Sequence, residues 1–288
     1  MHNLSVLDNG AESLSPCGTV LFFFSLRGNG GQSDMTEEEK FLFDLEGYLV
    51  VPGVLSPQEV TELNQLADEA WPGEHDETGL RRTANISQWG PRFRDLIDHP
   101  NIIPYLVELM GPKFRIDHDY SMFMQRGTSR STLHGGPSPQ CYEGDHWYRF
   151  YPDGTIRNGL TVFTYNLSDC NAGDGGFACI PGSHKTPLLS AIPEEVRTFQ
   201  RSAHYVHQPP VKAGDLIIFT EALVHGTLAW DAAHERRALL YKYSPGHSSW
   251  SDEYYDPDNY PGVTEQQVRI MAPPSVGSRP DSVQEQDE

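Results

Sequence analysis

The pattern of apolar residues changes character once along the chain, near Phe114. Before that point, apolar residues recur at helical spacing behind good N-caps. Thr36 with Glu39 predicts one helix, ended by Gly47, and Ser56 followed by proline predicts a second. Beyond Phe114 the apolar runs are short and are separated by Gly, Pro, Asn and Asp. A helical first third followed by many short strands predicts one α+β domain built on an antiparallel barrel or sandwich.

The predicted elements follow this division. A short strand at 48–51 separates the first two helices, and two shorter helices are expected near 91–97 and 102–110. The segment 71–85 is polar and is expected to be irregular. Strands are expected at 114–124, 160–167, 176–180, 203–208, 215–219, 222–224 and 237–243.

Both ends of the chain differ in composition from the middle. Residues 1–34 are rich in Gly, Ser and Asn, and Met35 resembles a natural start, so we expect a disordered N-terminal extension. Residues 272–288 are rich in Pro, Ser and acidic residues, which favours a disordered acidic tail. The folded domain is therefore expected to span 35–271.

The charge balance excludes several classes of partner. The chain has 21 Lys and Arg against 40 Asp and Glu, a formal net charge of −19. Such a surface repels phosphate backbones and anionic lipid, which disfavours nucleic acid and membranes as partners. No apolar run approaches the roughly 18 residues of a membrane span. The acidity is typical of a cytoplasmic protein.

Several common enzyme motifs are missing. The four cysteines form no CxxC pair, so neither a disulfide framework nor a structural zinc site is indicated. The sequence has no P-loop, no GxGxxG opening a helix after a strand, no GxSxG and no HExxH. These absences remove several large classes of nucleotide-dependent enzyme, hydrolase and metalloprotease.

Three histidines and one arginine stand beside predicted strand ends. His134, His184 and His225 occupy such positions, although a lone histidine at a strand end is usually structural. Arg236 follows His225 by eleven residues and begins an apolar strand. An arginine at the mouth of an apolar barrel is costly unless it meets an anion, and a dicarboxylate suits its planar guanidinium.

Four pieces of sequence, in this order, resemble the phytanoyl-CoA dioxygenase-like iron(II)/2-oxoglutarate oxygenases. They are DLEGYLVVPGVLS at 44–56, GGFACIPGSHK at 175–185, AGDLIIF at 213–219, and VHGT at 224–227 followed by Arg236. The resemblance covers most of the chain from about residue 37 to about residue 243. Their order and spacing make the resemblance specific, although each piece alone is weak.

The resemblance implies a fold, an activity and a set of site residues. The implied fold is a double-stranded β-helix (jelly roll, cupin-like) with N-terminal helices packed on one sheet. The implied enzyme is a dioxygenase that hydroxylates a small organic substrate, with Fe(2+) as cofactor, 2-oxoglutarate as co-substrate and ascorbate as an optional addition. His134 and His225 would bind the metal, Arg236 the far carboxylate of 2-oxoglutarate, and Thr227 would add a hydroxyl. No catalytic residue beyond the metal centre is implied, and His184 is expected to be structural.

The sequence departs from the family pattern at one metal ligand. The family's His-x-Asp corresponds here to His134-Gly135-Gly136, and Gly136 has no side chain that could bind iron. The position could stay open to chloride or water, as in halogenase-like relatives. A carboxylate from Glu143 or Asp145 could replace it. Alternatively, the metal is lost and the barrel is a non-catalytic small-molecule binder.

A long aromatic and polar segment follows this motif. Residues 137–157 contain His146, Trp147 and several tyrosines and would form a long loop. Loops of this kind cover the site in many enzymes and shape substrate choice. We therefore expect this segment to be a lid.

Overall fold

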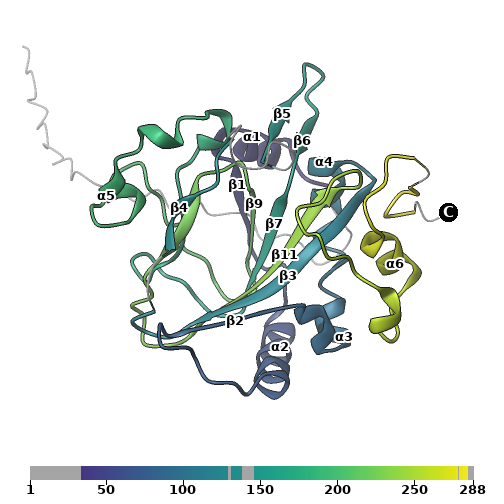
Figure 1. Cartoon of the computed structure of the whole chain (residues 1–288), viewed down its shortest axis with the longest axis horizontal. Helices are drawn as coiled ribbons and strands as arrows, with labels where there is room; N and C mark the ends of the chain where they lie inside the picture. The colour runs from purple at the N-terminus through teal and green to yellow at the C-terminus, as the bar shows by residue number, and fades with distance from the viewer. Residues whose placement is uncertain (1–33, 129–130, 138–145, 278, 285–288) are drawn as a thin grey trace, which may run out of the picture. The chain divides into compact units, whose positions relative to one another are not determined.

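The computed structural model describes residues 34–128, 131–137, 146–277 and 279–284, which Figure 1 draws in colour. None of the helices in these ranges is both long and apolar enough to span a membrane. The helices are α1 (Glu37–Glu46), α2 (Pro57–Ala70), α3 (Pro91–Arg94), α4 (Ile103–Met110), α5 (Glu194–Arg197) and α6 (Glu265–Met271). The strands are β1 (Tyr48–Val51), β2 (Leu80–Ala84), β3 (Phe114–Met124), β4 (Ser131–His134), β5 (Tyr148–Phe150), β6 (Ile156–Asn158), β7 (Thr161–Asn166), β8 (Gly176–Cys179), β9 (Leu216–Thr220), β10 (His225–Leu228) and β11 (Arg236–Pro245).

The first two helices begin and end as their sequences predict. Thr36 and Ser56 each accept a hydrogen bond from the backbone of the glutamate three residues later, whose side chain bonds back to the cap. Gly47 adopts a left-handed conformation (φ 81°) that closes α1 and turns the chain directly into β1. Local chemistry therefore sets both the helices and their junction with the sheet.

The strands form antiparallel sheets. A six-stranded sheet has the order β1-β9-β7-β11-β3-β2, a three-stranded sheet the order β4-β10-β8, and β5 and β6 form a separate hairpin. The two longest strands, β3 and β11, pair along their whole length and lie side by side in the middle of Figure 1. The fold is mixed α/β with antiparallel sheets.

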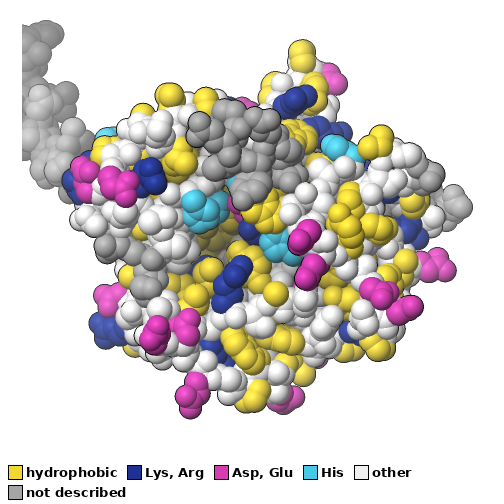
Figure 2. All heavy atoms as spheres, in the orientation of Figure 1, with side chains coloured by type: hydrophobic (Ala, Val, Ile, Leu, Met, Phe, Trp, Pro, Cys, Tyr) yellow, Lys and Arg dark blue, Asp and Glu magenta, His cyan; other side chains and the backbone are white. Residues whose placement is uncertain are grey.

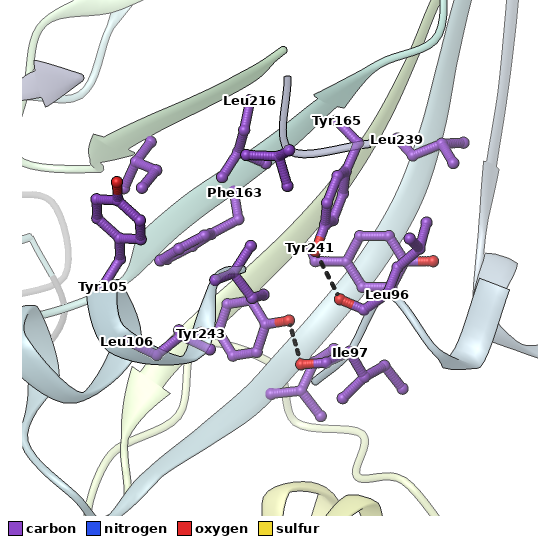
Figure 3. Close-up of a cluster of buried hydrophobic side chains, with 14 of the residues drawn as sticks. Leu96, Ile97, Tyr105, Leu106, Phe163, Tyr165, Leu216, Leu239, Tyr241 and Tyr243 are labelled. Atoms are coloured by element: carbon purple, nitrogen blue, oxygen red, sulfur yellow. Dashed lines mark hydrogen bonds between the residues drawn. The ribbon is translucent and has the colours of Figure 1, made fainter. Parts of the chain in front are cut away.

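One face of the six-stranded sheet carries the larger apolar core. Side chains of β7 and β11 pack there with buried residues from helices α1 to α4 and α6. Figure 3 shows three tyrosines of these strands, Tyr165, Tyr241 and Tyr243, among the apolar side chains. The hydroxyl of Tyr165 donates to the carbonyl of Leu96 at 2.9 Å and that of Tyr243 to Ile97 at 2.7 Å. Each polar tip is therefore satisfied inside the core.

Removing one of these hydroxyls gives a measurable stability change. Tyr243→Phe leaves the carbonyl of Ile97 buried without its donor. We expect the free energy of unfolding to fall by about 1–3 kcal/mol, the usual cost of an unsatisfied buried polar group. Denaturant unfolding of the two proteins measures this difference, and unchanged stability would contradict the role given to the bond.

The opposite face of the six-stranded sheet turns toward the three-stranded sheet. A second buried cluster joins residues from both sheets, including Val162, Phe219 and Leu240 from the larger and Phe177 and Cys179 from the smaller. The two sheets thus share an apolar interior. Of the predicted site residues, His225 and Arg236 are buried, whereas His134 is exposed and Thr227 is half-buried.

Several sequence predictions of strands are corrected. Segment 203–208 forms no strand and contributes one isolated bridge, between His207 and Cys179. Residues 222–224 form a turn, so that His225 begins β10 instead of following a strand. Strand β2 and the hairpin β5–β6 were not expected; β2 is an edge strand in which two arginines replace the usual apolar alternation.

A buried arginine lies in the described part of the C-terminal segment. The guanidinium of Arg279 is buried and donates to the carbonyls of Ala272, Pro273, Phe114 and Arg269. These contacts tie the described part of 272–284 to β3 and α6, and the disordered acidic tail stays an expectation. A single buried arginine donates hydrogen bonds to several backbone carbonyls at once. The amino-acid composition of the segment does not reveal such contacts.

Candidate metal centre

Two predicted metal ligands lie next to each other across paired strands. His134 ends β4 and His225 begins β10, and the two residues are register partners. Their ring centroids are 4.4 Å apart, with the planes tilted by 56°. The antiparallel pairing of β4 and β10 therefore brings together histidines that are 91 residues apart in the sequence.

Both imidazoles are held in the same tautomer. Nδ1 of His134 lies 2.8 Å from the carbonyl oxygen of Thr132, and Nδ1 of His225 lies 2.8 Å from that of Leu223. A carbonyl oxygen only accepts, so each Nδ1 carries the proton and each Nε2 keeps its lone pair. This is how metal-binding histidines are commonly oriented, and the pair fits a first-row metal ion.

The two strands approach closely because of glycine. A Cβ on Gly135 would lie 2.6 Å from the carbonyl oxygen of Leu223, and one on Gly226 would lie 2.8 Å from that of Thr132. Gly135 and Gly136 are both left-handed, with φ of 79° and 86°. The backbone at position 136 is thus one that side chains rarely adopt, and no carboxylate is available there.

Two phenylalanine rings lie against His225. It is 6% exposed, and its ring lies 4.7 Å from the ring of Phe219 and 6.3 Å from that of Phe177. This burial lowers the pKa of His225 to about 4, although Glu221 opposes the shift. The imidazole is therefore neutral at physiological pH, as metal binding requires.

A carboxylate that the sequence analysis missed lies beside this histidine. Glu221 follows β9 and is 4% exposed, and its Oε1 lies 2.6 Å from Nζ of Lys242 on β11. Its Oε2 lies 3.8 Å from Nε2 of His225 and 3.9 Å from Nε2 of His146. Burial raises the pKa of Glu221, but the ion pair with Lys242 and the nearby His225 and His146 together more than offset it and hold that pKa well below its usual range. The only signal in the sequence is an acidic residue inside the apolar stretch 216–224.

Arg236 points into the interior between the sheets. It is 5% exposed, and the only hydrogen bond of its guanidinium among the described residues goes to Sδ of Met124 at 3.5 Å. No carboxylate in the described ranges lies within ion-pair distance of it, and burial lowers its pKa. A Cβ on Gly176 would lie 2.8 Å from Nε of Arg236, so glycine makes room for this side chain. A buried guanidinium without a counter-ion fits a carboxylate ligand.

The neighbouring arginine faces the other way. Arg237 donates to Asp68 and Glu235 and lies over the ring of Phe123 on the helix-covered face. Arg236 and Arg237, which are adjacent on β11, therefore point to opposite faces of the sheet, as strand alternation predicts.

Thr227 lies on β10 near the Arg236 end of the site. It pairs with Phe177 of β8, whose neighbour Gly176 is the residue against Arg236. Its side chain is half-buried, and its backbone N–H donates to Oγ of Ser131. Thr227 thus lies on the three-stranded sheet, across the shared interior from Arg236 on the six-stranded sheet.

The other predicted residues lie elsewhere. His184 is buried in a short 3-10 turn, where its Nε2 lies 3.1 Å from the carbonyl oxygen of Asp44 and its ring meets that of Tyr148 edge-on. Glu143 and Asp145 lie outside the described residues. Within the described ranges, no three His, Cys, Asp or Glu side chains already lie close enough together to hold a metal ion.

Part of the predicted lid is a hairpin tied to the N-terminal helix. The hydroxyl of Tyr148 on β5 donates to the carboxylate of Asp44 on α1. Ahead of the hairpin, His146 stacks on Trp250 at 5.3 Å and approaches Glu221. Figure 2 shows histidine and basic side chains gathered near the centre of the face in view.

The chain matches the family model described as phytanoyl-CoA dioxygenase (PhyH) over residues 43–238. No curated protein matches. Among solved structures, HygX from Streptomyces hygroscopicus with nickel, 2-oxoglutarate and hygromycin B bound is 22% identical, with a TM-score of 0.66 over 74% of this chain and 89% of that chain. HygX with iron bound is 25% identical, with a TM-score of 0.64 over 74% and 88%. SnoK, a non-heme alpha ketoglutarate dependent carbocyclase from nogalamycin biosynthesis, is 20% identical, with a TM-score of 0.58 over 86% and 95%.

Proposed function

The chain belongs to the phytanoyl-CoA dioxygenase (PhyH) family, and from that premise we propose that it hydroxylates a small organic substrate. It is an oxidoreductase that uses Fe(2+) and 2-oxoglutarate. The proposed reaction converts 2-oxoglutarate and O2 to succinate and CO2. The observation that carries the proposal is the pairing of His134 and His225, each with Nε2 available, near a buried Arg236 that has no carboxylate partner among the described residues.

The proposed architecture is a double-stranded β-helix, or jelly roll, spanning residues 35–271. The six-stranded and three-stranded sheets would be its two faces, since both contribute side chains to one interior cluster. Helices α1 to α4 would cover the outer face of the larger sheet, where they share its core. The site lies between the sheets, where His225, Glu221 and Arg236 are buried and His134 is exposed.

Each site residue has a proposed task. His134 and His225 would bind the metal through Nε2, and Arg236 would pair with the far carboxylate of 2-oxoglutarate, with Thr227 adding a hydroxyl. The bound iron would supply the activation of O2. The protein orients the co-substrate through the fixed guanidinium and excludes water through the two phenylalanine rings against His225. We further propose that the substrate is a small organic molecule and that the enzyme is cytoplasmic. Ascorbate is an optional addition to the reaction.

An anaerobic titration tests this function. Adding Fe(II) and then 2-oxoglutarate is expected to produce a visible charge-transfer band, because that band needs both bound to the same centre. With O2, the loaded protein is expected to release succinate. An iron-free protein that makes no succinate would overturn the enzyme and leave a non-catalytic small-molecule-binding jelly roll.

A halogenase-like open site is the second candidate. It is favoured by Gly136, which carries no carboxylate and adopts a left-handed backbone. An open coordination position next to two histidines would accept a small anion such as chloride. If this candidate is right, adding chloride changes the visible spectrum of the metal-loaded native protein.

A further inference from the structure

Oε2 of Glu221 and Nε2 of His225 face each other, and each of the two atoms presents a lone pair. Nε2 of His225 has no proton, because the proton is on the Nδ1 that donates to Leu223. Oε2 of Glu221 offers only lone pairs, and it lies 3.8 Å from that nitrogen. The separation exceeds the roughly 2.7–3.2 Å of an N–H···O hydrogen bond. Two acceptors facing each other in a buried place call for a cation between them.

The carboxylate is oriented for this task. Lys242 occupies Oε1 at 2.6 Å, so Oε2 is the oxygen left facing the imidazoles. The ammonium of Lys242 also lies 5.5 Å from the ring centroid of Tyr120, a second contact that helps to hold the lysine. The ion pair with Lys242 therefore restrains the Glu221 carboxylate where its Oε2 faces His225.

The backbone brings Glu221 close to the incomplete ligand motif. A Cβ on Gly135 would lie 2.8 Å from the carbonyl oxygen of Glu221 and 3.1 Å from Nδ1 of His225. The turn at 221–224 therefore packs directly against the His134-Gly135-Gly136 motif. A side chain from this turn can reach the centre that residue 136 cannot serve.

We propose that Glu221 is the carboxylate ligand of the metal centre, in place of the aspartate that Gly136 lacks; this rests on the proposed function. Metal–ligand bonds of roughly 2.0–2.2 Å place neighbouring ligand atoms roughly 3 Å apart. Oε2 therefore needs to approach Nε2 of His225 by less than about 1 Å. His134, His225 and Glu221 then form a two-histidine, one-carboxylate set with positions left for 2-oxoglutarate and O2.

Metal binding without 2-oxoglutarate tests the assignment directly. Fe(II), and Co(II) as its spectroscopic substitute, are titrated anaerobically into the native protein and into Glu221→Gln. We expect the variant to bind at least tenfold more weakly and to give a different Co(II) visible spectrum, because one ligand is lost. Glu235→Gln is the matched control, since Glu235 also holds a half-buried ion pair, with Arg237, on the other face of β11. Its metal affinity and spectrum are expected to equal those of the native protein.

Two further measurements do not depend on the stability of the variant. In the native protein, metal binding is expected to shift an infrared glutamate carboxylate stretch. Chloride is expected to leave the native Co(II) spectrum unchanged, whereas Glu221→Gln, with a position opened, becomes chloride-sensitive. A chloride response in the native protein, or no carboxylate shift, would overturn the inference.

The outcomes separate this inference from the function on which it rests. A native protein that binds no metal overturns both. A native protein that binds metal, with Glu221→Gln unchanged in Co(II) spectrum, overturns only the role of Glu221. If Glu143→Gln or Asp145→Asn, and not Glu221→Gln, changes the Co(II) spectrum, the role of Glu221 is likewise overturned. The carboxylate ligand is then the residue whose replacement has this effect.

Discussion

Replacing His225 with alanine is expected to abolish metal binding and, with it, all consumption of 2-oxoglutarate. His225 presents Nε2 to the site in a fixed tautomer, and only its partner His134 would remain of the histidine pair. One histidine with one carboxylate leaves too few protein ligands for this class of iron site. Metal content after loading with Fe(II), together with succinate release, measures the effect.

His184→Ala is the matched control for this variant. His184 is equally buried, but it packs against Tyr148 and Gly47 in a turn and has no part in the proposed site. It is expected to lose stability and keep its metal. His225→Gln, which preserves more of the side-chain volume against Phe219, checks that metal loss is not a folding defect. Native metal content in His225→Ala would contradict the assignment of this residue.

The sequence predicts those parts of the fold that local chemistry determines. Thr36 and Ser56 mark helix starts because a cap and its partner are three residues apart, and Gly47 marks an end because few other residues adopt its φ. Strand alternation alone predicts that Arg236 and Arg237 face opposite sides of the sheet. Such features need no knowledge of distant contacts.

Features that depend on long-range contacts could not be predicted in this way. Strand β2 has the sequence LRRTA, and its Arg81 is buried because it reaches the carbonyl oxygens of Trp71 and Gly73 and the carboxylate of Glu235. Arg279 similarly ties the C-terminal segment to carbonyls distant in sequence, including that of Phe114. Neither pattern is apolar, so periodicity gives no signal.

The same reason explains why Glu221 was missed. An acidic residue in an apolar stretch is uninformative until its partners are known, and Lys242 lies 21 residues later on another strand. The sequence instead drew attention to Glu143 and Asp145 because they are close to the incomplete motif along the chain. In the fold, the turn before β10 is the segment that packs on Gly135.

Arg236→Ala is expected to weaken 2-oxoglutarate binding by about 2–5 kcal/mol, the usual loss when one partner of a buried charge pair is removed. The guanidinium lies in a buried interior where no described carboxylate competes for it, so a bound dicarboxylate would interact with it at full strength. Metal affinity measured without 2-oxoglutarate is expected to stay close to native. Arg236→Lys is expected to recover only part of the loss, because an ammonium cannot make the paired contacts of a guanidinium.

Arg237→Ala provides the comparison on the same strand. Arg237 pairs with Asp68 and Glu235 on the opposite face, so its removal is expected to lower the free energy of unfolding and leave 2-oxoglutarate affinity near native. Calorimetric titration of 2-oxoglutarate into the metal-loaded variants, beside thermal unfolding of each, separates the two effects. Equal losses of 2-oxoglutarate affinity would mean that Arg236 contributes no specific contact. The co-substrate would then have to bind away from the interior between the two sheets.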